Sequence, residues 1–190
     1  GDAEVPVAEL VTDPVADLAA LRPLRNPAIP LPPAILPGRE NSAGVDLADP
    51  LVRGPLLERL QALSGVMWKA GPSLPSGLPS GEPGQTRAIV SPQNHARQVG
   101  LVTEASLSDI DQAIAAAQAI QPGWCALGGE RRALLLEAAA DLFEQHQDEF
   151  LSLCQREAGK TLLDSVLELR EGVDFLRYYA GEARRLFSAP

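Results

Sequence analysis

The sequence is poor in the side chains that bind metals or form covalent cross-links. It has two cysteines, Cys125 and Cys154, and two histidines, His95 and His146. None of the four has the paired spacing typical of zinc ligands or of a redox motif, so we expect no metal site. Nothing in the sequence requires a disulfide, which favours a reducing compartment.

Clusters of lysine and arginine are also missing. The chain has 16 basic and 25 acidic residues and a net charge of −9. Nucleic acids and anionic membranes attract grouped positive charges, so we expect neither as a partner of this segment. The two arginine pairs, Arg131-Arg132 and Arg184-Arg185, fall in helical patterns, and we interpret them as solvated helix faces.

Long apolar runs are absent as well. No stretch approaches the length that crosses a bilayer. The first residues lack the basic start and apolar core of a secretory signal. We therefore expect a soluble, cytoplasmic protein.

Proline and glycine are concentrated in residues 1–85, which hold 14 of the 17 prolines and 9 of the 16 glycines. Proline fixes φ and has no N–H, so this half cannot supply long helices or central strands. Two short helical patterns remain, an interrupted one at 7–21 and one at 55–63 that opens on a proline. We expect irregular or polyproline-like chain at 23–37 and a flexible loop at 71–85.

The pattern becomes regular after residue 85. Residues 86–90 and 98–103 are strand candidates joined by turn residues, which predicts an antiparallel hairpin. A helix then begins at Ser106 or Ser108, each with an aspartate three residues later, and should stop before Pro122. Its predicted inward face is Ile110, Ala113, Ile114 and Ala117.

Three further helices are predicted. The first, at about 130–145, has an apolar face made of Leu134, Leu135, Ala138, Ala139, Leu142 and Phe143. The second ends at Gly159, and Thr161 caps the third, with Asp164 at the reciprocal position.

The third of these helices has the clearest pattern, a continuous apolar stripe over about seven turns. The stripe comprises Leu162, Val166, Leu169, Val173, Leu176, Ala180, Ala183 and Phe187. Two strands are too few to cover all these helices, so we expect the rest of the sheet beyond Pro190. On the flank, Arg170, Asp174 and Arg177 are spaced for exposed ion pairs along the helix.

Several stretches resemble a known family. Residues 156–161, Arg-Glu-Ala-Gly-Lys-Thr, and 173–181, Val-Asp-Phe-Leu-Arg-Tyr-Tyr-Ala-Gly, resemble the aldehyde dehydrogenase half of proline utilization A. Residues 39–47, Arg-Glu-Asn-Ser-Ala-Gly-Val-Asp-Leu, are similar to the segment that joins the two halves of that bifunctional enzyme. Residues 86–187 resemble the beginning of the aldehyde dehydrogenase fold.

The resemblance implies an α/β parent fold, aldehyde dehydrogenase-like, with a Rossmann-type NAD-binding domain. This segment would be mainly α-helical, with one short β-hairpin and a Pro/Gly-rich N-terminal half. The implied domains are the tail of a proline dehydrogenase domain at 1–22, a linker at 23–85 with a short helix near 55–64, and the N-terminal part of an aldehyde dehydrogenase domain at 86–190.

The resemblance also implies two reactions. FAD oxidises L-proline to pyrroline carboxylate; after hydrolysis, a cysteine thiolate attacks glutamate semialdehyde and NAD accepts the hydride, giving L-glutamate. The implied partners are these substrates, the remaining parts of both dehydrogenase domains and further copies in a homo-oligomer. Substrate channelling between the two sites and a peripheral place of the parent at the inner membrane belong to the same expectation.

The residues that perform this chemistry have no counterpart in the sequence. Cys125 and Cys154 lie outside the Gly-Gln-x-Cys setting of the family's nucleophile, and the oxyanion-hole segment and general base have no match. We therefore predict no catalytic, cofactor-binding or metal-binding residue here, and an inactive isolated chain. Glu168 is a candidate neighbour of the aldehyde pocket, although a solvated or ion-paired glutamate is favoured. Lys160 is interpreted as part of a structural turn rather than a phosphate site.

Two alternatives remain open. The chain could be a non-catalytic scaffold or binding fragment derived from an aldehyde dehydrogenase, or a helical module without a ligand.

Overall fold

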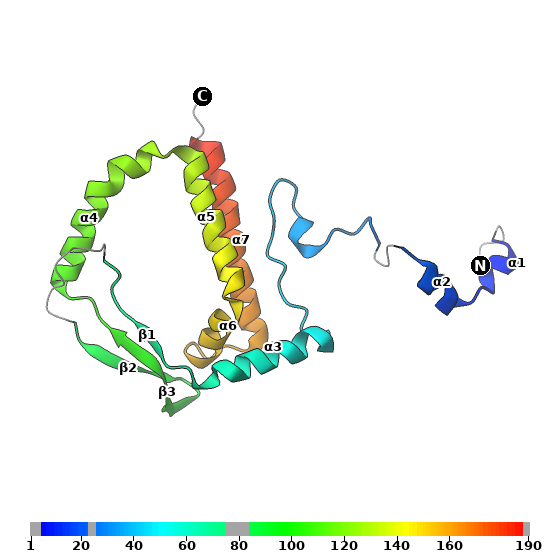
Figure 1. Cartoon of the computed structure of the whole chain (residues 1–190), viewed down its shortest axis with the longest axis horizontal. Coiled ribbons are helices and arrows are strands. Elements are labelled where there is room, and N and C mark those ends of the chain that lie inside the picture. Colours follow the sequence, from blue (N-terminus) through cyan, green and yellow to red (C-terminus); the bar gives the residue numbers. More distant parts are fainter. Residues whose placement is uncertain (1–4, 23–25, 75–83, 188–190) are drawn as a thin grey trace.

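A computed structural model describes residues 5–22, 26–74 and 84–187. A small sheet lies at one end of the long helices, and the first two short helices lie apart from it (Figure 1). The elements are α1 Val7–Leu10, α2 Pro14–Ala20, η1 Pro32–Ala34, α3 Pro50–Ala62, η2 Leu63–Gly65, β1 Trp68–Ala70, β2 Thr86–Ser91, β3 Asn94–Thr103, α4 Leu107–Ala126, α5 Gly128–Gln145, α6 Gln147–Arg156 and α7 Leu162–Phe187. None of the helices in these ranges is long and apolar enough to cross a bilayer.

The proline-rich half contains short helices, as the sequence predicts. The pattern at 7–21 splits into α1 and α2 because Pro14 takes the first position of α2, and the Asp13 side chain accepts the Val15 N–H at 2.9 Å. Both helices lie apart from the other elements (Figure 1). Of the loop predicted at 71–85, residues 75–83 lie outside the described residues, so its flexibility stays a prediction.

Helix α3 is longer than the predicted helix at 55–63. Asp49 caps it by accepting the Leu51 N–H, and Pro50 occupies the first turn, so this cap and proline together set its start. The placement of Pro55 at the first helical position was therefore wrong, since Pro55 lies inside the helix. The carbonyl four residues earlier belongs to Leu51, which is exposed, so water can satisfy the group that Pro55 leaves unpaired.

The sheet has three strands in the order β1-β3-β2. The predicted antiparallel hairpin is confirmed as β2 and β3. The sequence missed β1, which pairs parallel to β3 with Trp68 opposite Gly100. A three-residue strand carries no detectable alternation of apolar and polar residues, so the expectation of a lone hairpin was incomplete.

Helix α4 begins as predicted but ends later. Ser106 and Asp109 form a reciprocal capping box. The prediction that the helix stops before Pro122 was wrong, because α4 continues to Ala126. Proline keeps a helical φ and removes only one N–H, and the chain around Pro122 is exposed, so the freed carbonyl can bond to water.

The predicted inward face of α4 was also wrong among the described residues. Ile110 and Ile114 are 46% and 54% exposed, and Ala113 and Ala117 are exposed too. Periodicity identifies the apolar face of a helix but does not supply the surface that covers it.

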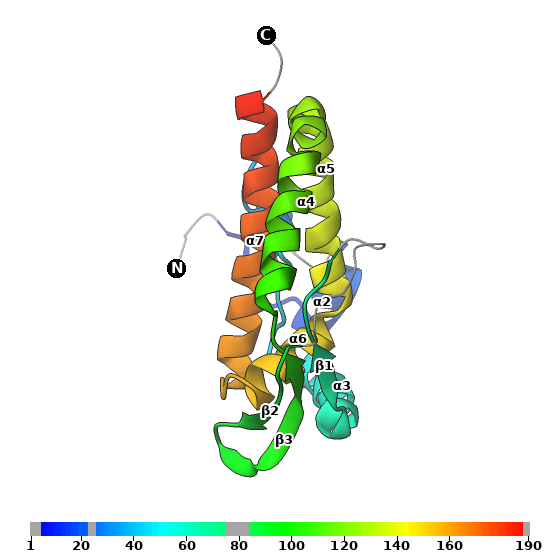
Figure 2. The same ribbon diagram turned by 90° about the vertical axis from the view of Figure 1, so that its left-hand side faces the viewer.

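Helices α5 and α7 form an antiparallel pair (Figure 2). They meet through small residues, with Ala133 and Ala140 of α5 and Ala180 of α7 fully buried. A Cβ at Gly129 would lie 2.3 Å from the Ala183 carbonyl oxygen, so this contact requires glycine. The leucine-rich side of α5 does not take part: Leu134, Leu135 and Leu142 are 45–52% exposed, contrary to a core role for that face.

The apolar stripe of α7 is confirmed along most of its length. Val166, Val173 and Ala180 are buried, whereas Phe187 at the end is 52% exposed and lies under the Arg132 guanidinium at 4.2 Å. The main cluster joins three helices through Leu56 of α3, Leu151 of α6 and Val166 of α7, with Val45, Leu47, Leu60, Leu162 and Leu169 around it.

Candidate functional site

Residues 38–47, called here the docked segment, run along α7 and are held by it (Figure 1). The Ser42 N–H donates to Asp174 Oδ1 at 2.7 Å, and the Asn41 N–H donates to the Pro33 carbonyl at 2.9 Å. Asn41 and Ser42 are buried, and Val45 and Leu47 pack against the main apolar cluster. This part of the predicted linker therefore packs on the helical core.

Gly44 lies where the docked segment passes closest to α7. Its φ is +67°, in the left-handed region that costs other residues about 1–2 kcal/mol. A Cβ at this position would also lie 2.8 Å from Cδ of Arg170. Both the backbone conformation and the contact with Arg170 therefore favour glycine.

We predict that Gly44→Ala lowers the free energy of unfolding by about 1–2 kcal/mol, because alanine is strained at this φ and displaces Arg170. Amide hydrogen exchange at Ser42 should become faster in the same variant. Gly38→Ala is the matched control: Gly38 also has positive φ, but a Cβ there meets nothing within 4 Å. Equal acceleration at Ser42 in both variants would contradict a specific role for the Gly44 contact.

The buried side chain of Arg177 links α7 to α5. Its side chain is 9% exposed and its Nη2 lies 3.0 Å from Asp141 Oδ1 and 2.7 Å from Glu144 Oε2. Burial by itself lowers the pKa of Arg177, but the hydrogen bonds that Arg177 donates to Glu144 and Asp141 outweigh it, and the pKa is raised. The predicted ion pairs among Arg170, Asp174 and Arg177 were wrong: Asp174 instead binds the docked segment and Arg177 binds α5.

Arg184 forms a second link between the same helices. Its Nε lies 2.8 Å from Glu130 Oε2, and its Nη2 lies 2.9 Å from Glu137 Oε2. The hydrogen bond from Arg184 lowers the pKa of Glu137 against the opposing effect of burial, and it lowers the pKa of Glu130 in the same way. Arg184 is therefore more than part of a solvated face, which corrects the interpretation of that arginine pair.

Because Glu130 and Glu137 must be ionised to bind Arg184 strongly, we predict that this contact between α5 and α7 is sensitive to acid. Because their pKa values are lower in the folded state, their stabilisation is present above the ordinary value of 4.5 and is lost as pH falls below it. We expect Arg184→Gln to destabilise the chain at neutral pH and to make its unfolding free energy less dependent on pH below 4.5. Urea titrations at several pH values measure this, with exposed Arg131→Gln as the control. An unchanged acid dependence in Arg184→Gln would refute it.

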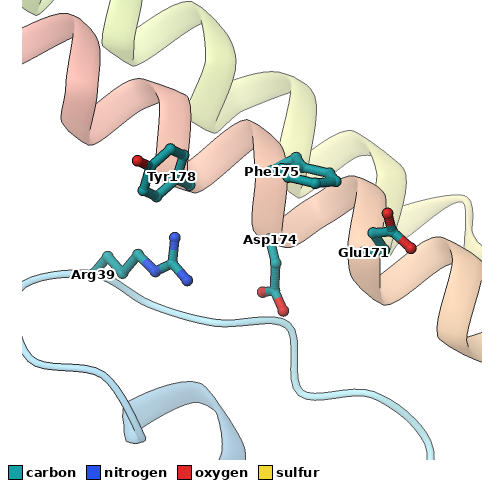
Figure 3. Close-up of a pocket in the computed structure, with 5 residues that line it drawn as sticks. All are labelled: Arg39, Glu171, Asp174, Phe175 and Tyr178. Carbon is teal, nitrogen blue, oxygen red and sulfur yellow. The ribbon is translucent and has the colours of Figure 1, made fainter.

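A cavity of about 310 Å³ opens where the docked segment meets the outer side of α7. Arg39 of the segment and four α7 residues, Glu171, Asp174, Phe175 and Tyr178, line it. Figure 3 shows the Arg39 side chain extending toward the part of α7 that carries Tyr178 and Asp174. The Arg39 guanidinium lies 5.4 Å from the centre of the Tyr178 ring, which is within cation–π range.

The candidate residues named in the sequence analysis do not line this cavity. Glu168 forms an ion pair with Lys160, and its side chain is 55% exposed, which agrees with the favoured interpretation of that glutamate. Burial, with a contribution from Glu168, raises the pKa of the Cys154 thiol, so it is a poor nucleophile at neutral pH. Cys125 is exposed and its Sγ accepts a hydrogen bond from Gln121 Nε2 at 3.1 Å.

The motif at 156–161 has a structural part in this fold. Arg156 is buried and donates to the carbonyls of Leu63 and Val66 at 3.0 and 2.9 Å, so it fixes the turn that leads from α3 into β1. Gly159 has φ +70°, and the Asp164 N–H donates to Thr161 Oγ1 at 3.1 Å. The predicted cap at Thr161 is confirmed. The helix before it ends at Arg156, three residues before the predicted end at Gly159.

The described residues do not fit a dinucleotide. NAD sits on a glycine-rich turn between a strand and a helix, with its pyrophosphate at the helix N-terminus. Here the link from β3 to α4 contains no glycine, and the Asp109 carboxylate accepts the Ser106 N–H at the start of α4. Asp164 takes a similar place at the start of α7. A carboxylate in each position repels a phosphate, so we derive no step through NAD here.

Comparison with known proteins separates the chain into a part that matches a family and a part that precedes the match. The sequence profile described as the aldehyde dehydrogenase family matches residues 80–189, which is more than half of the chain. The chain belongs to the aldehyde dehydrogenase family. Within this family, α4 to α7 and the β2–β3 hairpin are the matched portion, and the docked segment lies before it.

The resemblance to proline utilization A is confirmed over nearly the whole length. "Bifunctional protein PutA" of Klebsiella aerogenes is 38% identical over 190 residues, covering 96% of this chain and 14% of that protein. The crystal structure of proline utilization A from Bdellovibrio bacteriovorus inactivated by N-propargylglycine matches with a TM-score of 0.74 and 27% identity, over 96% of this chain and 18% of the other. This aldehyde dehydrogenase chain therefore spans about 14% of the length of its curated relative.

An aldehyde dehydrogenase of similar fold has been solved with a nicotinamide cofactor. The Delta-pyrroline-5-carboxylate dehydrogenase from Mycobacterium tuberculosis, bound with NAD and cobalamin, matches with a TM-score of 0.66 and 25% identity. The match covers 82% of this chain and 30% of the other. NAD is thus bound by a member of the family to which this chain belongs.

Sequence reasoning missed the residues that hold the docked segment. Ser42, Gly44 and Asp174 all lie in the stretches that resemble proline utilization A, so the signal for their importance was present. What it did not show was that the two stretches meet, because Ser42 and Asp174 are 132 positions apart.

Proposed function

We propose that this chain is part of a cytoplasmic bifunctional enzyme that oxidises L-proline to L-glutamate. Its parent would contain an FAD-dependent proline dehydrogenase and an NAD-dependent glutamate-semialdehyde dehydrogenase. This segment joins the halves and supplies structural helices, without catalytic, cofactor-binding or metal-binding residues of its own. Its partners are the remaining parts of both domains and further copies in a homo-oligomer.

The observation that carries the proposal is similarity to PutA proteins along 96% of the chain, including the stretch before the aldehyde dehydrogenase match. An ordinary aldehyde dehydrogenase would explain only residues 80–189. The docked segment supports the same conclusion, because its contacts with α7 fix the path of the polypeptide as it enters the dehydrogenase region.

Contacts of the docked segment support the proposed structural role. The docked segment is anchored by Asp174 and by the apolar cluster, so the preceding polypeptide enters at a fixed place on α7. An anchored entry keeps two catalytic halves in a constant orientation, which suits transfer of an intermediate between them. Glu168 stays the candidate for a residue beside the aldehyde pocket, although its ion pair with Lys160 supports the alternative, a structural role.

An assay of two proteins tests the proposal. The full-length natural protein should reduce NAD when L-proline is supplied with an electron acceptor for the flavin, and the 190-residue chain should form no NADH from glutamate semialdehyde. NADH formation by the short chain would refute the assignment of its residues as structural. A full-length protein without proline-dependent activity would favour the scaffold alternative.

A further inference from the structure

A second cavity, of about 250 Å³, lies between the docked segment and helices α5, α6 and α7. Residues 42–45 of the docked segment form one side of it, and the helices supply Glu144, Gln147, Leu151, Val166, Leu169 and Arg170. The proposed function gives this cavity no role. It is slightly smaller than the usual range of about 300–1,000 Å³ for small-molecule sites, so a ligand for it must be compact.

Arg170 brings an unused positive charge into this cavity. Its Nε is buried and has no hydrogen-bond partner, and within the described part of the chain its side chain forms no ion pair. The side chain lies against the docked segment, since a Cβ at Gly44 would be 2.9 Å from Arg170 Nε. A buried donor without a partner is unfavourable, above all on a charged group. An anion beside Arg170 would supply the missing acceptor.

The other polar groups of the cavity favour one negative charge on the ligand and no positive charge. Glu144 is the one carboxylate among the described lining residues, and its Oε2 already accepts a hydrogen bond from Arg177 Nη2 at 2.7 Å. Gln147 is neutral, and its amide can donate to a second oxygen of an anion. An ammonium group would meet the Arg170 cation and a carboxylate that is already engaged, which disfavours amines and amino acids.

The floor of the cavity is apolar. Leu151 and Val166 are buried, and Val45 and Leu169 pack against them in the main cluster. A short branched hydrocarbon chain placed on this floor would leave water without entering the closed core. We propose that the cavity binds a compact branched-chain monocarboxylate, with its carboxylate on Arg170 and its methyl groups over Val166 and Leu169.

Such a ligand would strengthen the attachment of the docked segment. The site is built from both the segment and the helices, so it exists only while residues 42–45 stay in place. A ligand that binds only this arrangement favours it by a factor of one plus the ligand concentration divided by Kd. This effect does not depend on which reaction the longer protein performs.

Hydrogen exchange of the natural longer protein, followed by mass spectrometry on peptides that cover residues 38–47, tests the site locally. The probes are sodium isovalerate, isovaleramide, which keeps the shape without the charge, and sodium acetate, which keeps the charge without the branched chain. We expect isovalerate to slow exchange at residues 42–45, with half of the effect at about 1–10 mM, as is usual for a ligand of so few atoms.

Isovaleramide and acetate should each need about 10-fold higher concentrations, because one lacks the charge-assisted contact and the other the apolar contact. Sodium chloride keeps the ionic strength equal in all samples. An effect of acetate or of isovaleramide equal to that of isovalerate would overturn the proposal.

Variants assign the effect to this cavity. Arg170→Gln should raise the required isovalerate concentration at least about 10-fold, and Arg131→Gln, the same change at an exposed position of α5, should not alter it. Gln147→Glu should also weaken binding, because it places a like charge in the cavity, and an acidic residue is favourable at the start of α6. Gln145→Glu is the matched control outside the lining. Absence of slowing at about 100 mM isovalerate, or an unchanged effect in both Arg170→Gln and Gln147→Glu, would refute the proposal.

Discussion

Leu151→Ala should lower the free energy of unfolding by about 3 kcal/mol. Leu151 is fully buried in α6 and contacts Leu56 of α3 and Val166 of α7 in the cluster that joins the three helices. Its truncation removes apolar contacts and leaves a space that three separately anchored helices cannot easily close. Urea unfolding followed by circular dichroism measures the change.

Leu163→Ala is the control for this prediction, because Leu163 is 57% exposed near the start of α7. The control should change the unfolding free energy by less than about 0.5 kcal/mol, as surface substitutions usually do. The docked segment should also loosen in Leu151→Ala, since Val45 and Leu47 pack against the same cluster. A cost for Leu151→Ala no greater than the control would contradict the placement of the core.

Arg177→Met should destabilise the chain by about 2 kcal/mol. The substitution keeps much of the side-chain volume but leaves Asp141 and Glu144 without their shared cation. Removing one partner of a fully buried pair costs about 3–5 kcal/mol, and we expect less because the side chains of Asp141 and Glu144 are 60% and 33% exposed. The measurement is again urea unfolding at neutral pH.

Arg131→Met provides the matched control, since it makes the same chemical change at an exposed position of α5. It should alter stability by only a few tenths of a kcal/mol. If Arg177→Met were as stable as the unmodified chain, hydrophobic packing rather than the carboxylate contacts would hold α5 against α7.

Local signals in the sequence predicted local structure well. The box of Ser106 and Asp109 and the cap at Thr161 each depend on a few neighbouring residues, and both are confirmed. The β2–β3 hairpin is confirmed for the same reason. Such features are decided by backbone dihedrals and hydrogen bonds within a few positions. The predicted helix end at Gly159 was three residues late, since α6 ends at Arg156.

The wrong predictions concern helix faces, helix ends and ion-pair partners that depend on distant parts of the chain. Periodicity gave α5 a leucine face, but Gly129 and Ala133 allow a closer approach to α7, and the leucines are left exposed. Pro122 breaks a helix in isolation, yet α4 passes through it. Arg177 had suitable neighbours on its own helix, but its partners lie on α5.

The candidate site was predictable only in part. Resemblance drew attention to 39–47 and 173–181, which contain Arg39 and Asp174, but the first stretch was assigned to a Pro/Gly-rich linker at 23–85. The cavity exists because these two stretches lie together, and nothing in the spacing of a single sequence encodes that contact.

We propose above all that these residues act as a structural part of a longer proline-oxidising enzyme. The most direct test is to capture the natural protein with an antibody raised against a peptide of this sequence and to measure its intact mass by denaturing mass spectrometry. We expect a polypeptide far heavier than the 20.1 kDa chain, in keeping with the 14% coverage of its PutA relative. A natural polypeptide of 20.1 kDa alone would contradict it.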